Sequence, residues 1–259
     1  MDLHEVLERV AVGEMEVAEA ESRLAGYVTG AAGRYDTSRL YRRGIPEAIF
    51  GPGKSTTEIV ELVSIAVDRN GIGIVTRIDE QDRNRIVETF EHEPAVETVT
   101  IYPRAGAVVV VGRERDVPPV TTMVGLISAG TSDAAVIEEA KIVLDALDIE
   151  VKEISDVGVA NLTRSLDQLE RISECDVLIV AAGREGALPT VLAGLVDRPV
   201  IGLPVSSGYG YGGEGKAALL GMLQSCTVLS VVNIDAGFVA GAQAGLIAQA
   251  ISSGPKQQD

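Results

Sequence analysis

The fold is decided by the stretch Met123-Val-Gly-Leu-Ile-Ser-Ala-Gly-Thr-Ser-Asp133. It opens with an apolar run of strand length, passes through a turn of small residues and leads at once into helical spacing at 134–147. A strand that passes through such a turn into a helix is the repeating unit of parallel α/β sheets. The stretch therefore predicts the first βα unit of a parallel sheet.

The same unit recurs toward the C-terminus. Strands are predicted at 151–154, 177–180, 200–203 and 229–234, and each is followed by a helical stretch. Runs such as 177–180 are continuous rather than alternating, which is typical of parallel strands that helices cover on both faces. Five βα units predict a doubly wound, three-layer α/β domain over 118–259.

A smaller α/β domain is predicted upstream, over 1–117. It would open with two short amphipathic helices, at 3–10 and 15–24. The break before the next domain is Val117-Pro118-Pro119. The remaining expected elements are strands at 48–50, 73–76, 96–102 and 107–111 and helices at 56–68 and 82–90.

Composition narrows the class of function. The net charge of −16 argues against an extended contact with nucleic acid, although backbone amides can still bind a compact anion. No apolar run is long enough to span a membrane, and the N-terminus lacks the layout of a secretory signal. We therefore expect a cytoplasmic protein without a membrane partner. The acidic, lysine-poor composition fits either a high-salt cytoplasm or ordinary acidic solubility.

Three small-residue turns follow strands of the predicted sheet, at 128–133, 181–189 and 204–213. Ligands of doubly wound sheets bind at the carboxyl ends of the strands, and helix starts there offer unpaired amides to phosphate. The turns predict a site for an anionic ligand, most simply a nucleotide. Ser132 and Asp133 could instead only cap a helix. The candidate binding residues are Gly130, Thr131, Ser132, Gly183, Glu185, Gly186, Ala187, Ser206, Gly208, Tyr209 and Gly210.

Further candidates lie outside these turns. Asn233 and Asp235 follow the last strand, although Asp235 could equally cap the final helix. Lys54 lies in Gly51-Pro52-Gly53-Lys54-Ser55, a fragment of a phosphate-binding loop, and could contact an anion or simply be a solvated lysine.

Nucleophiles and metal ligands are few. Cys175 and Cys226 are too few for a disulfide framework, and each is either core filler or a reagent. Both histidines, His4 and His92, fall outside the C-terminal domain, which excludes a Ser-His-Asp arrangement there. No Cys/His spacing identifies a metal site, so the metal stays undetermined.

Several motifs together resemble the LarB family, the carboxylase of nickel-pincer cofactor biosynthesis. Its C-terminal domain is similar to the PurE type of aminoimidazole ribonucleotide carboxylase, which implies a flavodoxin-like three-layer fold. The likeness runs from about residue 36 to 250. The motifs are Arg42-Arg43-Gly44-Ile45-Pro46-Glu47, Gly53-Lys54-Ser55, Gly130-Thr131-Ser132-Asp133, Asp156-Val157-Gly158-Val159-Ala160, Gly183 to Pro189, Gly208-Tyr209-Gly210, Ser225-Cys226 and Val232 to Asp235.

The resemblance implies a reaction. Nicotinic acid adenine dinucleotide (NaAD) would be carboxylated at C5 of its pyridinium ring by carbon dioxide or bicarbonate. Hydrolysis of its phosphoanhydride would then give pyridinium-3,5-biscarboxylic acid mononucleotide and AMP. Cys226 matches the nucleophile, and Asp133 matches an acidic residue that contacts substrate or handles the C5 proton. No tightly bound cofactor is implied, Mg²⁺ is compatible, and a homo-oligomer, an octamer by resemblance, is expected. The Cys226 thiol should then lie beside the glycine-rich turns.

The sequence departs from the family pattern at several positions. Thr163 stands where a His is expected, Arg184 where a Met is common, and Ala236 where an Asn usually follows; Val228-Leu229 replaces a Pro-Gly pair. Two alternatives therefore stay open. One is a PurE-type carboxylase or mutase of the purine pathway, which would lack its usual histidine here. The other is a nucleotide-binding module without catalysis.

Overall fold

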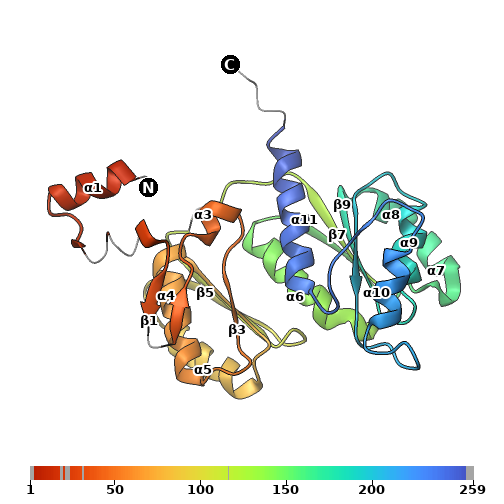
Figure 1. The fold of residues 1–259 in the computed structure, drawn as a ribbon, viewed down its shortest axis with the longest axis horizontal. Helices are drawn as coiled ribbons and strands as arrows, with labels where there is room; N and C mark the ends of the chain where they lie inside the picture. Colours follow the sequence, from red (N-terminus) through yellow and green to blue (C-terminus); the bar gives the residue numbers. More distant parts are fainter. Residues whose placement is uncertain (1–2, 18–19, 21–23, 31, 116, 255–259) are drawn as a thin grey trace. The chain divides into compact units, whose positions relative to one another are not determined.

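The computed structural model describes residues 3–17, 20, 24–30, 32–115 and 117–254, which form two compact units, 1–116 and 117–259 (Figure 1). The helix predicted over 15–24 lies partly outside these residues. In the part of the chain described, no helix is both long and apolar enough to cross a membrane.

The N-terminal unit contains a mixed four-stranded sheet. The strands lie in the order β3-β4-β6-β5, with β3 and β4 parallel and the other pairs antiparallel. The small α/β unit predicted from sequence is confirmed, but the hairpin β1–β2 and helix α3 were not anticipated. The elements are α1 (Leu3–Ala11), β1 (Val28–Gly30), β2 (Gly33–Tyr35), α3 (Arg39–Arg43), β3 (Ala48–Phe50), α4 (Thr56–Asn70), β4 (Ile72–Thr76), α5 (Glu80–Phe90), β5 (Val96–Tyr102) and β6 (Ala107–Gly112).

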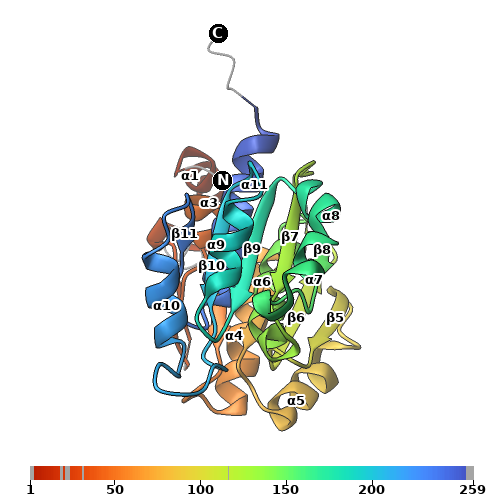
Figure 2. The same cartoon turned by 90° about the vertical axis from the view of Figure 1, so that its right-hand side faces the viewer.

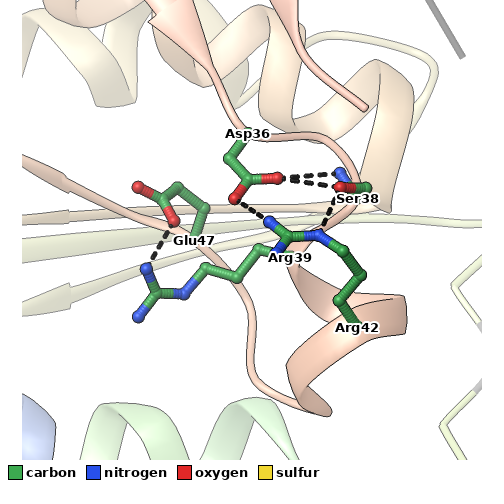
Figure 3. A network of polar contacts seen from close by, with 5 residues as sticks. All are labelled: Asp36, Ser38, Arg39, Arg42 and Glu47. Atoms are coloured by element: carbon green, nitrogen blue, oxygen red, sulfur yellow. Dashed lines mark hydrogen bonds and ion pairs between the residues drawn. The ribbon is translucent and has the colours of Figure 1, made fainter. Parts of the chain in front are cut away.

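A polar network ties the segment around α3 together (Figure 3). The Asp36 carboxylate accepts hydrogen bonds from Arg42 Nη2 at 2.5 Å and from Ser38 N and Oγ at 3.2 and 3.1 Å. Arg39 forms an ion pair with Glu47, with 2.9 Å between Nη1 and Oε2. Burial raises the pKa of Glu47, which the charge of Arg39 opposes. Part of the Arg42–Glu47 motif therefore has a structural role.

The C-terminal unit is a five-stranded sheet in which every pair of neighbours is parallel, in the order β11-β10-β9-β7-β8 (Figures 1 and 2). This is the doubly wound order of flavodoxin-like domains, as predicted. The strands are β7 (Met123–Ser128), β8 (Glu150–Ile154), β9 (Val177–Ala182), β10 (Val200–Pro204) and β11 (Ser230–Val231). Strand β11 is shorter than the predicted 229–234, because only its two residues pair with β10.

Helices cover both faces of this sheet. Helices α6 (Ala134–Ala146) and α11 (Gly237–Ser252) pack against each other on one face. On the other, buried side chains of α8 (Leu169–Ser173), α9 (Ala187–Ala193) and α10 (Lys216–Leu223) join one apolar core cluster with the strands. Helix α7 (Leu162–Leu166) precedes α8. Strands β7, β9 and β10 are thereby buried on both faces, as their apolar pattern indicated, whereas the edge strands β8 and β11 are partly exposed.

Helices α6 and α11 approach each other at two glycines. A Cβ atom on Gly237 would lie 2.2 Å from the carbonyl oxygen of Val136, and one on Gly241 would lie 2.5 Å from that of Ala140. Neither gap admits a side chain without moving a backbone.

We expect Gly241→Ala to destabilise the C-terminal unit by roughly 1–3 kcal/mol, because a methyl group at this contact forces the helices apart. Helix propensity alone would favour Ala by about 1 kcal/mol, so the sign of the change distinguishes the two effects. Thermal or urea unfolding measures it. Val239→Ala on the same helix, at a side chain 54% exposed, is the control and should change stability by less than about 0.5 kcal/mol. A stabilised Gly241→Ala variant would contradict the packing argument.

Candidate active site

A cavity of about 530 Å³ lies within the C-terminal unit, where the turns after β7, β8, β9 and β10 meet. These are the carboxyl ends of neighbouring parallel strands, the edge at which doubly wound sheets bind ligands. Its lining residues are Ala129, Gly130, Ser132, Asp133, Gly158, Val159, Ala160, Arg164, Ala182, Gly183, Arg184, Glu185, Gly186, Ala187, Leu188, Ser207, Gly208 and Tyr209.

The turn after β7 holds a buried carboxylate in this cavity. Asp133 is only 2% exposed. The Gly130 amide donates to Oδ2 at 3.0 Å, while the hydroxyls of Ser132 and Ser207 donate to Oδ1 at 3.2 and 3.4 Å. Burial raises the pKa of Asp133, and these hydrogen bonds only partly oppose it. A carboxylate with a raised pKa in a cavity is suited to accept and return a proton.

The turns after β9 and β10 meet backbone to backbone. A Cβ atom on Gly208 would lie 2.2 Å from the carbonyl oxygen of Gly183, so position 208 requires glycine for this contact. Gly186 has a φ of +70°, and a Cβ there would lie 2.5 Å from the carbonyl oxygen of Ala218. The small residues of these turns therefore allow the two loops to pack backbone against backbone along one wall of the cavity.

Two arginines supply the positive charge of the cavity. Arg164, in α7, donates from Nη1 to Asp156 Oδ1 at 2.8 Å, while its buried Nε has no hydrogen-bond partner among the described residues. Arg184 stacks on the ring of Tyr209, with 4.0 Å between Cζ and the ring centroid. Cations and an unsatisfied donor beside glycine-rich turns are suited to an anionic ligand.

Most of the predicted binding residues come together here. Gly130, Ser132, Asp133, Gly183, Glu185, Gly186, Ala187, Gly208 and Tyr209 all line the cavity. Thr131, Ser206 and Gly210 belong to the same turns but do not line it.

Asn233 and Asp235 also lie outside the cavity lining. The Asp235 carboxylate accepts a hydrogen bond from the Ser206 amide at 2.9 Å, and the Asp235 amide donates to Pro204 O at 2.9 Å. Asp235 therefore holds the loop after β10 in place through these two hydrogen bonds, from outside the cavity. The exposed Asn233 accepts from the Ile234 amide through its own side chain.

Cys226 lies at the opposite edge of the sheet. It is exposed and belongs to the segment between α10 and β11, so it comes before the amino end of a strand. The hydroxyl of its neighbour Thr227 donates to the carbonyl oxygen of Thr190, in the middle of α9, at 3.4 Å. The five-residue strand β10 separates the two edges by roughly 16 Å. The expectation that the thiol lies beside the glycine-rich turns is therefore wrong within this chain.

Other candidates lie elsewhere. Lys54 is in the N-terminal unit, where its Nζ donates to Phe50 O at 2.6 Å, and the following Ser55 forms a capping box with Glu58. Its role in anion binding stays a prediction. Cys175 is buried, which raises its pKa and makes it core filler. Among the residues described, no group of three or more His, Cys, Asp or Glu side chains is arranged to hold a metal.

A larger open groove, about 810 Å³, runs between α4 and α5 in the N-terminal unit. Its one basic lining residue, Arg85, is within 3.5 Å of Glu88, and it has no glycine-rich turn. The smaller cavity of the C-terminal unit is therefore the better candidate.

Arg164 was not predicted as a site residue, and Arg184 and Ser207 lay within predicted ligand-binding turns without being singled out as candidates. Each follows a strand at the carboxyl edge, and that position was the available signal. The turn after β8 was quoted only as a motif, although Gly158 packs against Ala129, where a Cβ would lie 2.8 Å from the carbonyl oxygen.

Two family models match most of the chain. The model of the AIR carboxylase family matches residues 123–258, and that of the LarB/PurE-like N-terminal domain matches residues 28–111. An uncharacterized protein of Methanocaldococcus jannaschii is 39% identical over 223 residues, which cover 83% of this chain and 84% of that protein.

Two further similarities each cover about half of this chain. The N5-carboxyaminoimidazole ribonucleotide mutase of Methanocaldococcus jannaschii is 33% identical over 120 residues, covering 44% of this chain and 71% of the mutase. The crystal structure of Treponema denticola PurE is 16% identical, with a TM-score of 0.38, and covers 53% of this chain and 99% of that chain.

The AIR carboxylase match spans just over half of the chain, and the two family models follow each other in the order that the motifs indicated. Together they support a carboxylase-type role. The chain belongs to the LarB family, with a LarB/PurE-like N-terminal domain followed by an AIR carboxylase domain.

Proposed function

We propose that the chain is a cytoplasmic enzyme that carboxylates C5 of the pyridinium ring of NaAD and hydrolyses its phosphoanhydride. The products are pyridinium-3,5-biscarboxylic acid mononucleotide and AMP. The observation that carries the proposal is the cavity itself, in which a buried carboxylate lies beside two arginines and three glycine-rich turns. Phosphate suits the arginines and the turns, and the carboxylate suits the proton that leaves C5.

The chemistry needs a nucleophile because a pyridinium ring is electron-poor and does not attack carbon dioxide. Addition of the Cys226 thiolate to a ring carbon next to C5 forms a C–S bond and leaves an enamine. C5 then attacks carbon dioxide, Asp133 takes the C5 proton, and breaking the C–S bond returns the thiolate and the aromatic ring. Separately, water cleaves the phosphoanhydride and releases AMP.

Because Cys226 lies at the far edge of its own sheet, this mechanism requires the thiol of a second copy of the chain. The surface around it supports such an assembly. Leu220, Leu223 and Val228 are 61%, 61% and 95% exposed, an unusual density of apolar side chains for a free surface. We propose that this apolar surface is an interface in a homo-oligomer, and that it carries Cys226 to the cavity of the neighbouring copy.

The direct test is incubation of the full chain with NaAD and ¹³C-bicarbonate, with and without Mg²⁺, followed by mass spectrometry. We expect a product that has gained one labelled carboxyl group, together with stoichiometric AMP. Binding of NaAD without label incorporation would contradict the proposed reaction and favour a binding module.

A second candidate is a PurE-type mutase, which the 33% identity to N5-carboxyaminoimidazole ribonucleotide mutase favours. The same assay with N5-carboxyaminoimidazole ribonucleotide distinguishes the two, because only a mutase would move its carboxyl group to carbon. Neither His4 nor His92 belongs to the unit that contains the cavity, which argues against this candidate.

A further inference from the structure

Arg184 is placed to bind a ligand. Among the described residues it forms no ion pair, whereas Arg164 is paired with Asp156. Its guanidinium lies against the Tyr209 ring, and both residues line the cavity. Stacking occupies the face of a guanidinium and leaves the N–H groups in its plane available to an anion.

The stack is held in place by the backbone. Arg184 and Tyr209 directly follow Gly183 and Gly208, the two glycines whose backbones touch. The contact between the two loops therefore fixes the backbone positions of Arg184 and Tyr209. Stacking on the Tyr209 ring then orients the Arg184 guanidinium. Tyr209 is itself 77% exposed, so the pair lies at the opening of the cavity rather than in the core.

Strand order places the two arginines on either side of the turn that contains Asp133. Arg164 follows β8 and Arg184 follows β9, and these strands flank β7. At the sheet, two strand spacings separate β8 from β9 by roughly 10 Å. An anion on the β7 turn thus has one cation on each side, and a ligand with two phosphoryl groups can contact both.

The formal charges of the residues that line the cavity also indicate that Arg184 favours an anionic ligand. The cavity lining contains two arginines and two carboxylates, Asp133 and Glu185, so its formal charge is zero in a chain of net charge −16. Removal of Arg184 would leave the cavity negative, which opposes an anionic ligand.

We propose that Arg184, stacked on Tyr209, makes the cavity select ligands with two linked phosphoryl groups over ligands with one. This deepens the proposed function, on which it rests for the identity of the site, by naming the residue that would distinguish a dinucleotide from a mononucleotide. Arg184 is thus a specificity-determining residue, not a participant in bond making.

The test uses inorganic pyrophosphate and orthophosphate, which carry the distinguishing chemistry without a nucleoside. Isothermal titration of the full chain should show pyrophosphate binding at least about tenfold tighter than orthophosphate. Arg184→Met, which keeps an unbranched chain but no charge, should bring the two affinities within about twofold. Arg198→Met removes an exposed arginine two residues before β10, at the amino edge of the sheet, and should keep the wild-type ratio.

Two further variants test the stack itself. Tyr209→Phe keeps the ring and should keep the pyrophosphate preference, whereas Tyr209→Leu removes the ring and should reduce it severalfold. Arg184→Lys should retain part of the preference, since a lysine keeps the charge but not the planar fork. Because Arg184 and Tyr209 are exposed, these substitutions should leave the midpoint of thermal unfolding unchanged.

The proposal is overturned if wild type does not prefer pyrophosphate, if it binds no pyrophosphate, or if Arg184→Met keeps the wild-type ratio. These outcomes are separable from failure of the proposed function. A chain that prefers pyrophosphate through Arg184 but does not carboxylate NaAD refutes only the reaction. A chain that carboxylates NaAD with no such preference refutes only the role of Arg184.

Discussion

Asp133→Asn is expected to lower the turnover of NaAD by roughly 10²–10⁴-fold while the chain stays folded. The amide can keep the local hydrogen bonds, because its oxygen can accept from Gly130 and its nitrogen can donate to the rotatable hydroxyls of Ser132 and Ser207. What it cannot do is take up a proton. Single-turnover label incorporation measures the loss, and NaAD binding should change little by comparison.

The same substitution has a stability signature with a defined sign. Burial raises the pKa of Asp133 in the folded chain above its unfolded value. Between these two pKa values the folded chain binds more protons, so this group makes stability fall as pH rises through that window. At neutral pH the buried charge therefore costs stability, and Asp133→Asn should be as stable as wild type or more so. The advantage should disappear at a pH below both pKa values.

Asp176→Asn provides a matched control. Asp176 also accepts a hydrogen bond from a backbone amide, that of Met123 at 2.9 Å, but at the amino edge of the same sheet. The turnover of the Asp176→Asn variant should stay within about twofold of wild type, because Asp176 lies outside the cavity. Equal losses in both variants would mean that Asp133 acts through folding rather than through proton transfer.

Much of the C-terminal unit could be predicted because its signals are local. Continuous apolar strands, small-residue turns and helical spacing together give the βα repeat, and parallel strands bring those turns to one edge. The hairpin β1–β2 was missed because its strands have only three residues each, too few to show a period.

The site was harder to predict where it depends on which end of a strand a residue occupies. Cys226 precedes its strand, so a parallel sheet places it at the amino edge, whatever its likeness to a family nucleophile. Arg164 was not a candidate, and Arg184 belonged to a predicted turn without being singled out. The convergence of the two arginines depends on the order of β8, β7 and β9, which no local pattern encodes. The small-residue pattern identified the turns, whereas the strand order identified the pair of cations.

Cys226→Ala is expected to reduce carboxylation of NaAD by at least about 10³-fold, because without the thiolate the ring cannot become a nucleophile. Cys175→Ala is the control and should keep its turnover, since that thiol is buried in the core. The placement of Cys226 adds a stronger expectation. Because the thiol and Asp133 lie at opposite edges of one sheet, a working site must combine Asp133 of one copy with Cys226 of another.

Co-expression of two inactive variants tests this directly. Differently tagged Cys226→Ala and Asp133→Asn chains, purified through both tags, should regain activity, because random assembly gives about a quarter of the sites both intact groups. A chain that carries both substitutions, co-expressed with Cys226→Ala, should stay inactive, since no copy then supplies a thiol. Absence of rescue between mixed copies would place the chemistry within a single chain. In that case the thiol at the far edge could not be the nucleophile, and another group in the cavity would have to activate the ring.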